Sequence, residues 1–195
     1  MRKRTRIIGL GSYGSSIVNA ISEQHLASAS SLVAIDSDYR NLSRMKCVRN
    51  RVLLGEGKGA IGTLASFDFG LALAVHYRKK IEPLFESGRN IIVTGSGATG
   101  WGISRILIKS GLLKRSALIL QMPFWFEGTR RMIKAAENLR LAKSMKIRTI
   151  ALNEDKTMKN YRGKKGMNEN NLFDKARQEF IEKIKEVYHE EKLLR

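Results

Sequence analysis

The stretch RIIGLGSYGSSIVNAI, residues 6–21, decides the fold. Its first five residues form a short apolar run that ends at a glycine turn, which is typical of a buried β-strand. The turn GLGSYG, residues 9–14, follows, and Ile17 and Ile21 then recur with helical spacing. A strand that passes through a glycine turn into a helix is the opening unit of a parallel α/β sheet.

The same alternation continues along the 195 residues of the chain. The predicted strands are 6–10, 31–35, 51–54, 90–94, 117–122 and 147–152; the predicted helices are 12–27, 63–85, 103–113, 127–145 and 168–193; and 153–166 is a predicted basic loop. Continuous apolar strands such as IIVTG and ALILQM suit a sheet that is covered on both faces. We therefore predict one three-layer α/β domain over 1–195, with a Rossmann-like, mostly parallel sheet between helices. The segment 168–193 is expected to be an amphipathic C-terminal helix.

Composition excludes several classes of protein. A single cysteine and three scattered histidines argue against a disulfide framework, a zinc cage of cysteines and a His-rich metal site. No secretory signal and no uncharged apolar stretch of transmembrane length is visible, so a cytoplasmic protein is expected.

Charge suggests a partner but does not identify it. The chain carries 36 Lys plus Arg against 18 Asp plus Glu, a formal net charge of +18. Residues 101–150 hold eleven basic and two acidic side chains, whereas 174–195 hold six of each. An acidic protein, an anionic membrane surface or a nucleic acid would suit this excess, and a merely soluble basic surface is an equally good explanation.

The first glycine turn resembles a dinucleotide-binding fingerprint. Gly9, Gly11 and Gly14 stand between a strand and a helix, and Asp36 ends the next strand, 22 residues after Gly14. Glycines let the backbone approach a pyrophosphate, and the helix N-terminus attracts its charge. On this evidence the site would bind NAD, with Asp36 at a ribose hydroxyl; a tight turn without a ligand is the simpler alternative.

A second glycine turn favours a different ligand. The segment GSGATGWG, residues 95–102, again lies between a predicted strand and a predicted helix. Two such loops side by side suit a mononucleoside triphosphate that is held from several directions. The P-loop pattern GxxxxGK[ST] does not occur, which excludes that class of NTPase.

Six motifs, in chain order, resemble those of the FtsZ/tubulin superfamily. They are IIGLGSYGSSIVNAI, VAIDSD, LLGEGKGAIG, SGATGWG, MPFWFEGTRRMIKAAENL and TIALNED. They resemble the family's first two nucleotide loops, its γ-phosphate loop, the tubulin signature, the Pro-Phe-x-Phe-Glu-Gly segment and the strand that carries a base-contacting Asn. The resemblance covers nearly the whole chain. It implies the family's GTPase domain, with GTP or GDP bound and Mg²⁺ accompanying the nucleotide.

The resemblance also implies roles for individual residues. It assigns Gly11, Ser12, Gly14 and Ser15 to phosphate contacts, Gly97, Ala98, Thr99 and Gly100 to the α- and β-phosphates, and Gly57, Lys58 and Gly59 to the γ-phosphate, with Asp36 in the second loop. It places Glu127 at the ribose hydroxyls, Arg131 beside sugar and phosphate, and Asn153 at the guanine edge. Ser16 and Gln178 stand where the family has an Asn and an Asp near the base. Glu127 also fits a plain helix-terminal acid, and Arg131 a surface arginine.

Departures from the family pattern limit what the resemblance implies. Ala98 replaces a glycine and is expected to crowd the phosphates, Trp101 replaces a small residue, and Gln178 accepts only one of the guanine hydrogens well, which leaves base selectivity open. The family's synergy loop and second domain would follow the last helix, and we expect a natural single-domain form without them.

The predicted function follows from these departures. We expect a regulatory or assembly-related nucleotide-binding protein of cell division or the cytoskeleton, a GTPase at most, with weak turnover or turnover completed by a partner. Self-association or co-assembly with a full-length relative is expected. The alternatives are an NAD-binding sensor or dehydrogenase module and a degenerate scaffold that binds no nucleotide.

Overall fold

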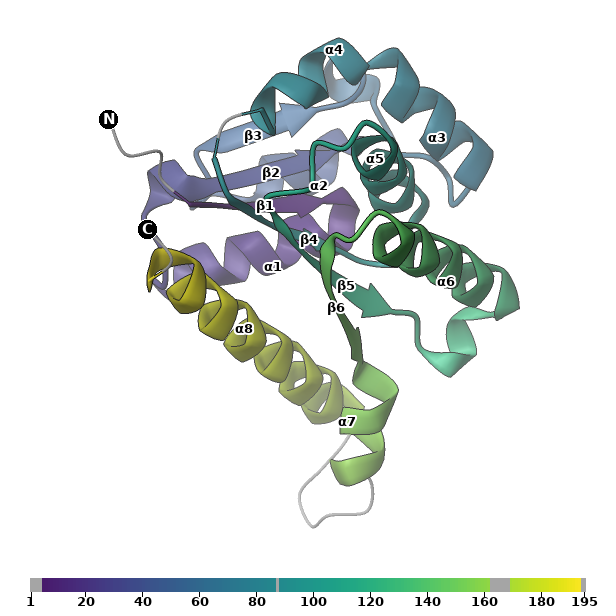
Figure 1. Ribbon diagram of the computed structural model, residues 1–195. Helices are drawn as coiled ribbons and strands as arrows, with labels where there is room; N and C mark the ends of the chain where they lie inside the picture. The colour runs from purple at the N-terminus through teal and green to yellow at the C-terminus, as the bar shows by residue number, and fades with distance from the viewer. Residues whose placement is uncertain (1–4, 87, 162–168, 194–195) are drawn as a thin grey trace.

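Six parallel strands form the central sheet in a computed structural model that describes residues 5–86, 88–161 and 169–193 (Figure 1). The strands are β1 (Arg6–Leu10), β2 (Leu32–Asp36), β3 (Asn50–Leu53), β4 (Asn90–Thr94), β5 (Ala117–Met122) and β6 (Arg148–Asn153). Their order is β3-β2-β1-β4-β5-β6. The order reverses between β1 and β4, which pair in register from Arg6↔Asn90 to Leu10↔Thr94. Ligands of doubly wound sheets bind at such a switch point, beyond the carboxyl ends of the strands.

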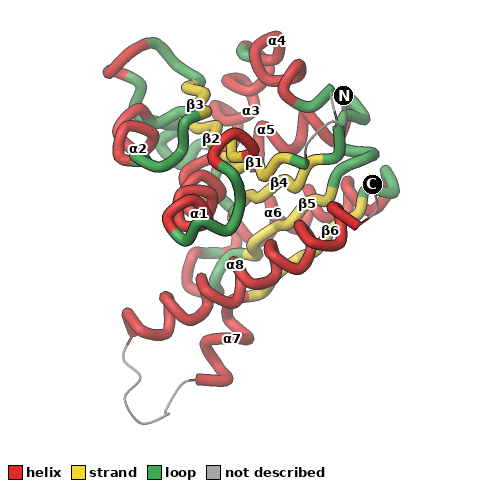
Figure 2. Tube along the Cα trace, turned by 90° about the vertical axis from the view of Figure 1, so that its left-hand side faces the viewer, coloured by secondary structure: helices red, strands yellow, loops and turns green. Residues whose placement is uncertain are grey.

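Helices cover both faces of the sheet, which confirms the predicted three-layer fold (Figures 1 and 2). The helices are α1 (Gly11–Glu23), α2 (Tyr39–Arg44), α3 (Phe67–His76), α4 (Arg78–Ile81), α5 (Ala98–Lys109), α6 (Thr129–Ser144), α7 (Glu154–Tyr161) and α8 (Glu169–Leu193). Helices α1 and α8 pack on one face, and α3 to α6 on the other. Strand residues alternate between the two cores, so that Ile7 joins the α1/α8 core and Ile8 the opposite one. Within the described residues no helix combines the length and hydropathy needed to span a bilayer.

The predicted long helix over 63–85 is wrong, because it breaks into shorter pieces. Leu64 and Ala65 adopt positive φ angles of 49° and 59°, and α3 begins only after Ser66, whose hydroxyl accepts from the backbone N–H of Phe69 at 3.3 Å. The helix ends at Tyr77, and a 3₁₀ turn over Glu82–Leu84 follows α4. Pro83, which lacks a backbone N–H, lies in that 3₁₀ turn.

Helices α5, α2 and α7 also differ from the expectation, and several other elements begin or end one to four residues away from their expected bounds. Helix α5 begins at Ala98, so the second glycine segment forms the first helical turn instead of preceding it. Helix α2 was not expected, and Asp38 caps it by accepting from the backbone N–H groups of Arg40 and Asn41. Helix α7 occupies much of the expected basic loop; the rest of that loop lies outside the described residues, as does Asn168, the expected first residue of the last helix.

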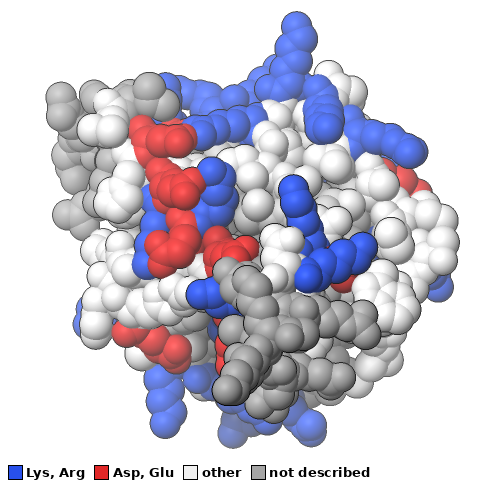
Figure 3. Space-filling model, turned by 90° about the horizontal axis from the view of Figure 1, so that it is seen from below, with Lys and Arg blue, Asp and Glu red and all other residues white. Residues whose placement is uncertain are grey.

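Helix α8 is amphipathic, as expected. Ala176, Phe180, Ile184 and Val187 are buried against the sheet and α1, whereas Phe173 is 39% exposed. On its outer face, Lys183 pairs with Glu186, and Lys185 with Glu182. Seen from below, Asp and Glu gather in one band with basic side chains beside it, while Lys and Arg project around the rim (Figure 3).

Candidate nucleotide site

A cavity of about 380 Å³ lies at the switch point, beyond the carboxyl ends of β1, β2 and β4. The predicted site residues that line it are Gly11, Ser12, Asp36, Gly97, Ala98, Thr99, Gly100, Glu127 and Arg131. The fold thus brings together predicted site residues from four of the six motifs, and Ile61 and Gly62 belong to a fifth. The cavity is also lined by residues that sequence reasoning did not single out: Leu10, Tyr13, Ser37, Asp38, Ile61, Gly62, Thr63, Leu64, Ala65, Gly95, Ser96, Gln121 and Phe124.

The two glycine turns meet backbone to backbone. A Cβ atom at Gly11, which has a φ of 67°, would lie 2.8 Å from the backbone N of Gly100. A Cβ atom at Gly100 would lie 2.4 Å from Thr94 Oγ1 and 2.8 Å from the carbonyl oxygen of Leu10. Both approaches are too close for any side chain. Glycine is therefore required here by the contact between the two loops as well as by any ligand.

Two helix N-termini open into the cavity without caps. In the described structure, neither α1 nor α5 has a side-chain hydrogen bond at its N-cap or an acidic residue in its first turn. The caps of α2 and α3, in contrast, are Asp38 and Ser66. Neither N-cap side chain therefore accepts from the first backbone N–H groups of its helix, and the positive ends of both helix dipoles lie at the cavity. This arrangement suits a ligand with several anionic oxygens.

A buried hydroxyl cluster joins three loops at the cavity wall. Thr99 Oγ1 lies 2.7 Å from Ser37 Oγ and 3.3 Å from Thr63 Oγ1. All three side chains are buried. Ser37 lies directly after Asp36 within the VAIDSD motif. That motif could therefore have identified Ser37 as a site residue. Thr63 was assigned to a helix, and only the broken helix brings it to the cavity.

Asp36 organises the second loop. Its Oδ2 accepts from Ser12 Oγ at 3.0 Å and from Asn41 Nδ2, and its Oδ1 accepts from the backbone N–H of Ser37 at 2.8 Å. Burial raises the pKa of the Asp36 carboxyl above its usual value, although these hydrogen bonds oppose the shift. The carboxylate thus ties the first glycine turn to the second loop.

Glu127 and Arg131 form an ion pair at the cavity. Glu127 Oε1 accepts from the backbone N–H of Phe124 at 2.9 Å, and Oε2 accepts from Ser96 Oγ at 3.3 Å and from Arg131. Glu127 therefore closes the 3₁₀ turn over Trp125–Glu127 and lines the cavity at the same time. The Arg131 side chain is 38% exposed, which leaves part of its guanidinium accessible to a ligand.

Three predicted residues of the first motif lie behind the cavity wall. A Cβ atom at Gly14 would lie 2.2 Å from the carbonyl oxygen of Val93, so this glycine allows α1 to pack on β4. Ser15 is buried, and its hydroxyl donates to the carbonyl of Ile35 at 3.4 Å. Ser16 donates to the carbonyl of Tyr13 at 2.8 Å.

The predicted γ-phosphate loop and the predicted base contacts also lie outside the cavity. Gly57, Lys58 and Gly59 form an exposed 3₁₀ turn, and the following residues 61–65 line the cavity instead. Asn153 and Gln178 line a separate cavity of about 460 Å³ between β6 and α8. Asn153 Oδ1 accepts from the backbone N–H of Asp155 at 3.0 Å, and Gln178 Nε2 donates to Glu182 at 2.9 Å.

Ala98 lines the cavity, whereas Trp101 does not. The Ala98 side chain packs with Phe67 and Trp101 on the side of α3. Trp101 is 5% exposed and does not line the cavity. Its Nε1 donates to the carbonyl of Lys134 at 2.8 Å, which joins α5 to α6. The expectation that Ala98 crowds the phosphates is therefore not supported by the direction of its side chain.

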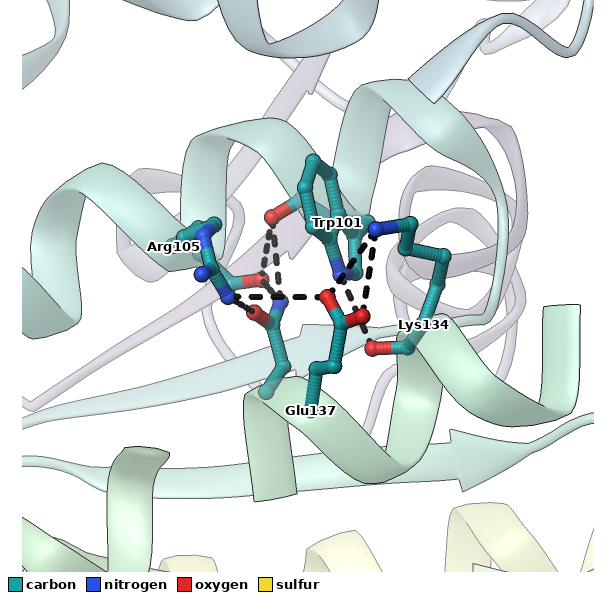
Figure 4. Close-up of polar contacts among 6 residues, drawn as sticks. Trp101, Arg105, Lys134 and Glu137 are labelled. Carbon is teal, nitrogen blue, oxygen red and sulfur yellow. Dashed lines mark hydrogen bonds and ion pairs between the residues drawn. The ribbon is translucent and has the colours of Figure 1, made fainter. Parts of the chain in front are cut away.

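The indole of Trp101 lies between two cations (Figure 4). Arg105 Cζ and Lys134 Nζ are each 5.1 Å from its ring centroid. Glu137 pairs with both cations, at 3.9 Å and 3.1 Å. This cluster joins α6 to α5, which begins at the second glycine turn. It therefore stabilises the position of that turn at the cavity.

Metal ligands are not gathered in the described part of the chain. Among residues 5–86, 88–161 and 169–193, no group of three or more His, Cys, Asp or Glu side chains is arranged to hold a metal ion.

Comparison with known proteins points to one superfamily. No protein-family model matches the chain. It is 29% identical over 160 residues to the cell division protein FtsZ of Aquifex aeolicus, covering 78% of this chain and 42% of that protein. It is 27% identical over 160 residues to FtsZ of Mycoplasmopsis pulmonis, covering 80% and 40%. The chain thus spans less than half the length of these relatives.

Solved structures agree with the sequence relatives. An empty FtsZ dimer from M. jannaschii superposes with a TM-score of 0.75 at 22% identity over 96% of this chain and 55% of that one. GDP-bound monomeric CetZ1 from Haloferax volcanii gives 0.72 at 21% identity over 92% and 58%. A protofilament of TubZ from bacteriophage PhiKZ gives 0.67 at 16% identity over 95% and 56%. These similarities show that the chain shares its fold with somewhat more than half of each of those chains.

Proposed function

We propose that this chain is a member of the FtsZ/tubulin superfamily and that it binds a guanine nucleotide, GTP or GDP, in the cavity at the switch point. The observation that carries the proposal is the junction of the two glycine turns. There, two uncapped helix N-termini and a close backbone contact between Gly11 and Gly100 create a surface made largely of main-chain atoms. Such a surface can surround phosphate oxygens without interference from side chains.

The side chains at the cavity fit the remaining parts of a nucleotide. Arg131 supplies a partly exposed cation for a phosphate, and Thr99 supplies a hydroxyl beside the α5 N-terminus. Glu127 lines the cavity, and we propose that it accepts from ribose hydroxyls, which are good donors to a carboxylate. Residues 61–65 form the part of the cavity wall that follows the exposed Gly57–Gly59 turn in the chain. That turn would contact a γ-phosphate only if it moved toward the cavity.

We further propose that the chain alone hydrolyses the nucleotide weakly. Three acidic residues line the cavity in the described structure: Asp36, Asp38 and Glu127. Each already accepts hydrogen bonds from the protein, Asp36 within its loop, Asp38 at the α2 cap and Glu127 at its 3₁₀ turn. None of these carboxylates is placed as an unengaged general base.

Around the cavity, exposed apolar side chains favour a partner at this face. Leu64 is 77% exposed and Trp125 71%, and both lie at or beside the cavity lining. Further exposed apolar side chains on the neighbouring loops and helices are Ile61, Phe69, Phe126, Met132 and Ile133. Exposed apolar patches of this kind mark interaction sites. We propose that a second copy or a full-length relative docks there and supplies the missing catalytic group.

The binding proposal is tested by calorimetric titration with GTP, GDP, ATP and NAD in the presence of Mg²⁺. Guanine nucleotides should bind. Arg131→Ala should lower the affinity for them at least tenfold, about 1.4 kcal/mol of binding free energy, because a charge-assisted contact is lost. Arg130→Ala is the matched control, because Arg130 is the adjacent cation, is 69% exposed and does not line the cavity. If NAD binds and this binding is lost in Asp36→Ala, the chain is an NAD-binding protein and the proposal is wrong. If none of the four ligands binds, the chain is a scaffold that binds no nucleotide.

Phosphate release tests the proposal of weak turnover. The purified chain should release phosphate slowly at every protein concentration, and addition of a full-length FtsZ should accelerate release from this chain's nucleotide. An FtsZ variant that cannot bind its own nucleotide but keeps its synergy loop avoids background turnover. Rapid release by the chain alone would contradict the proposal.

A further inference from the structure

Tyr13 closes the nucleotide cavity on the side of α8. It lies in the first turn of α1, within the first glycine turn, and it lines the cavity. A Cβ atom at Gly95 would lie 2.7 Å from Tyr13 Cβ and 2.9 Å from Cγ, so the side chain packs directly on the backbone of the second glycine turn. Tyr13 is therefore held between the two turns that form the phosphate-binding surface.

The ring of Tyr13 also contacts the wall of the second cavity. It packs edge to face on Phe180 of α8, with ring centroids 5.5 Å apart and an interplanar angle of 84°. Phe180 is 1% exposed and lines the 460 Å³ cavity that contains Asn153 and Gln178. The two cavities share no lining residue among the described part of the chain. The Tyr13–Phe180 pair thus stands between the phosphate end and the residues assigned to the base.

We propose that Tyr13 determines how well the site accepts a nucleobase, an inference that rests on the proposed binding of a guanine nucleotide. In the closed arrangement the cavity offers phosphate and sugar contacts, while the ring separates a bound nucleotide from Asn153 and Gln178. A purine reaches those residues only when the ring turns away from Phe180. The cost of breaking the aromatic pair then lowers the affinity for nucleotides, but not for ligands that lack a base.

The contacts of α8 extend this effect to the helix. Ser16, one turn from Tyr13, donates to the Tyr13 carbonyl, and its own carbonyl accepts from Arg177 of α8 at 3.0 Å. Rotation of the ring would therefore occur at the contact between α1 and α8. Binding of a base would therefore change the contact of Tyr13 with Phe180 and, through it, the packing of α8 on α1.

The test compares GTP with inorganic tripolyphosphate in calorimetric titrations of wild type, Tyr13→Ala and Tyr13→Phe. Removal of the ring should strengthen GTP binding by about three- to tenfold, the equivalent of one aromatic pair, and leave tripolyphosphate unchanged. Tyr13→Phe keeps the ring and its contact with Phe180, so its GTP affinity should lie closer to that of wild type than to that of Tyr13→Ala. Phe180→Leu, which removes the partner ring with little loss of volume, should shift GTP affinity in the same direction and serves if Tyr13→Ala folds poorly.

The outcomes separate this inference from the proposed function. GTP affinity that is unchanged or weaker in Tyr13→Ala would overturn the inference, because the ring would then be neutral or a stacking surface, while the proposed function would stand. An equal gain for tripolyphosphate would also overturn it, since the effect would not concern the base. Failure of wild type and both variants to bind GTP would overturn the proposed function and the inference with it.

Discussion

At the scale of single residues, the site depends on how closely backbone segments approach. Gly100 and Gly97 belong to the same motif, yet their surroundings differ. A Cβ atom at Gly100 would collide with Thr94 Oγ1 and with the carbonyl of Leu10, whereas one at Gly97 would meet nothing within 4 Å. Gly97 also has an ordinary φ of −71°. One glycine is thus required by the fold, and the other borders open space at the cavity.

This contrast predicts different effects of the two alanine substitutions. Gly100→Ala should lower the free energy of unfolding by about 2–3 kcal/mol, because backbone atoms must move to admit the methyl group. Gly97→Ala should change it by less than about 0.5 kcal/mol while weakening nucleotide binding, because its methyl group borders the cavity. Urea denaturation measures the first effect and calorimetry the second. Equal stability of the two variants would contradict the close approach.

Asp36 gives a pH dependence at the same scale. Its pKa is raised by burial above the ordinary value near 3.8, so the folded state binds the proton more tightly than the unfolded chain. Its contribution to stability is therefore present in full at low pH and is lost as pH rises through the folded pKa. The free energy of unfolding of wild type relative to Asp36→Asn should fall as pH rises from about 4. A difference that is flat or rises with pH would show that the hydrogen bonds from Ser12, Asn41 and Ser37 outweigh burial.

At the scale of elements, Trp101 joins α5 to α6 and so supports the second glycine turn. Its indole N–H donates to the Lys134 carbonyl, and its ring packs edge to face on Phe67 at 5.4 Å. Trp101→Phe should cost about 1 kcal/mol of stability through the lost hydrogen bond, and Trp101→Ala about 3–5 kcal/mol. Trp125→Phe is the control, because Trp125 is 71% exposed and should change stability by less than about 0.5 kcal/mol. Chemical denaturation of the three variants measures these differences.

At the scale of the whole molecule, a net charge of +18 should oppose the compact state. Salt screens this repulsion, and the exposed ion pairs of α8 contribute little that salt could remove. We therefore expect the melting temperature to rise when NaCl is increased from about 20 to about 200 mM. Differential scanning calorimetry measures the shift, and sucrose at matched osmolality serves as a control for excluded-solute effects. A fall in melting temperature with salt would show that ion pairs such as Arg148–Glu191, at 2.9 Å, outweigh the repulsion.

The sequence by itself determined the parallel sheet, the layers of helices and the two glycine turns at the switch point, because these depend on local features. Strands 90–94 and 117–122 were predicted with their observed bounds, since a continuous apolar run flanked by turn residues allows few other structures. Glycine in the two turns likewise predicts that backbone segments approach closely there. The break of the helix at residues 63–66 was missed, because positive φ angles at Leu64 and Ala65 have no local signal in non-glycine residues.

Only the tertiary structure decided which of the predicted site residues line one cavity and which lie elsewhere. The contact between Gly11 and Gly100, the side of α5 on which Ala98 and Trp101 pack, and the pairing of Tyr13 with Phe180 each join segments far apart in the chain. No local pattern specifies which side chain fills the space between two distant elements, because packing is settled by every neighbour at once. For that reason the motifs predicted a nucleotide site, while the separation of Asn153 and Gln178 from the cavity at the two glycine turns is visible only in three dimensions.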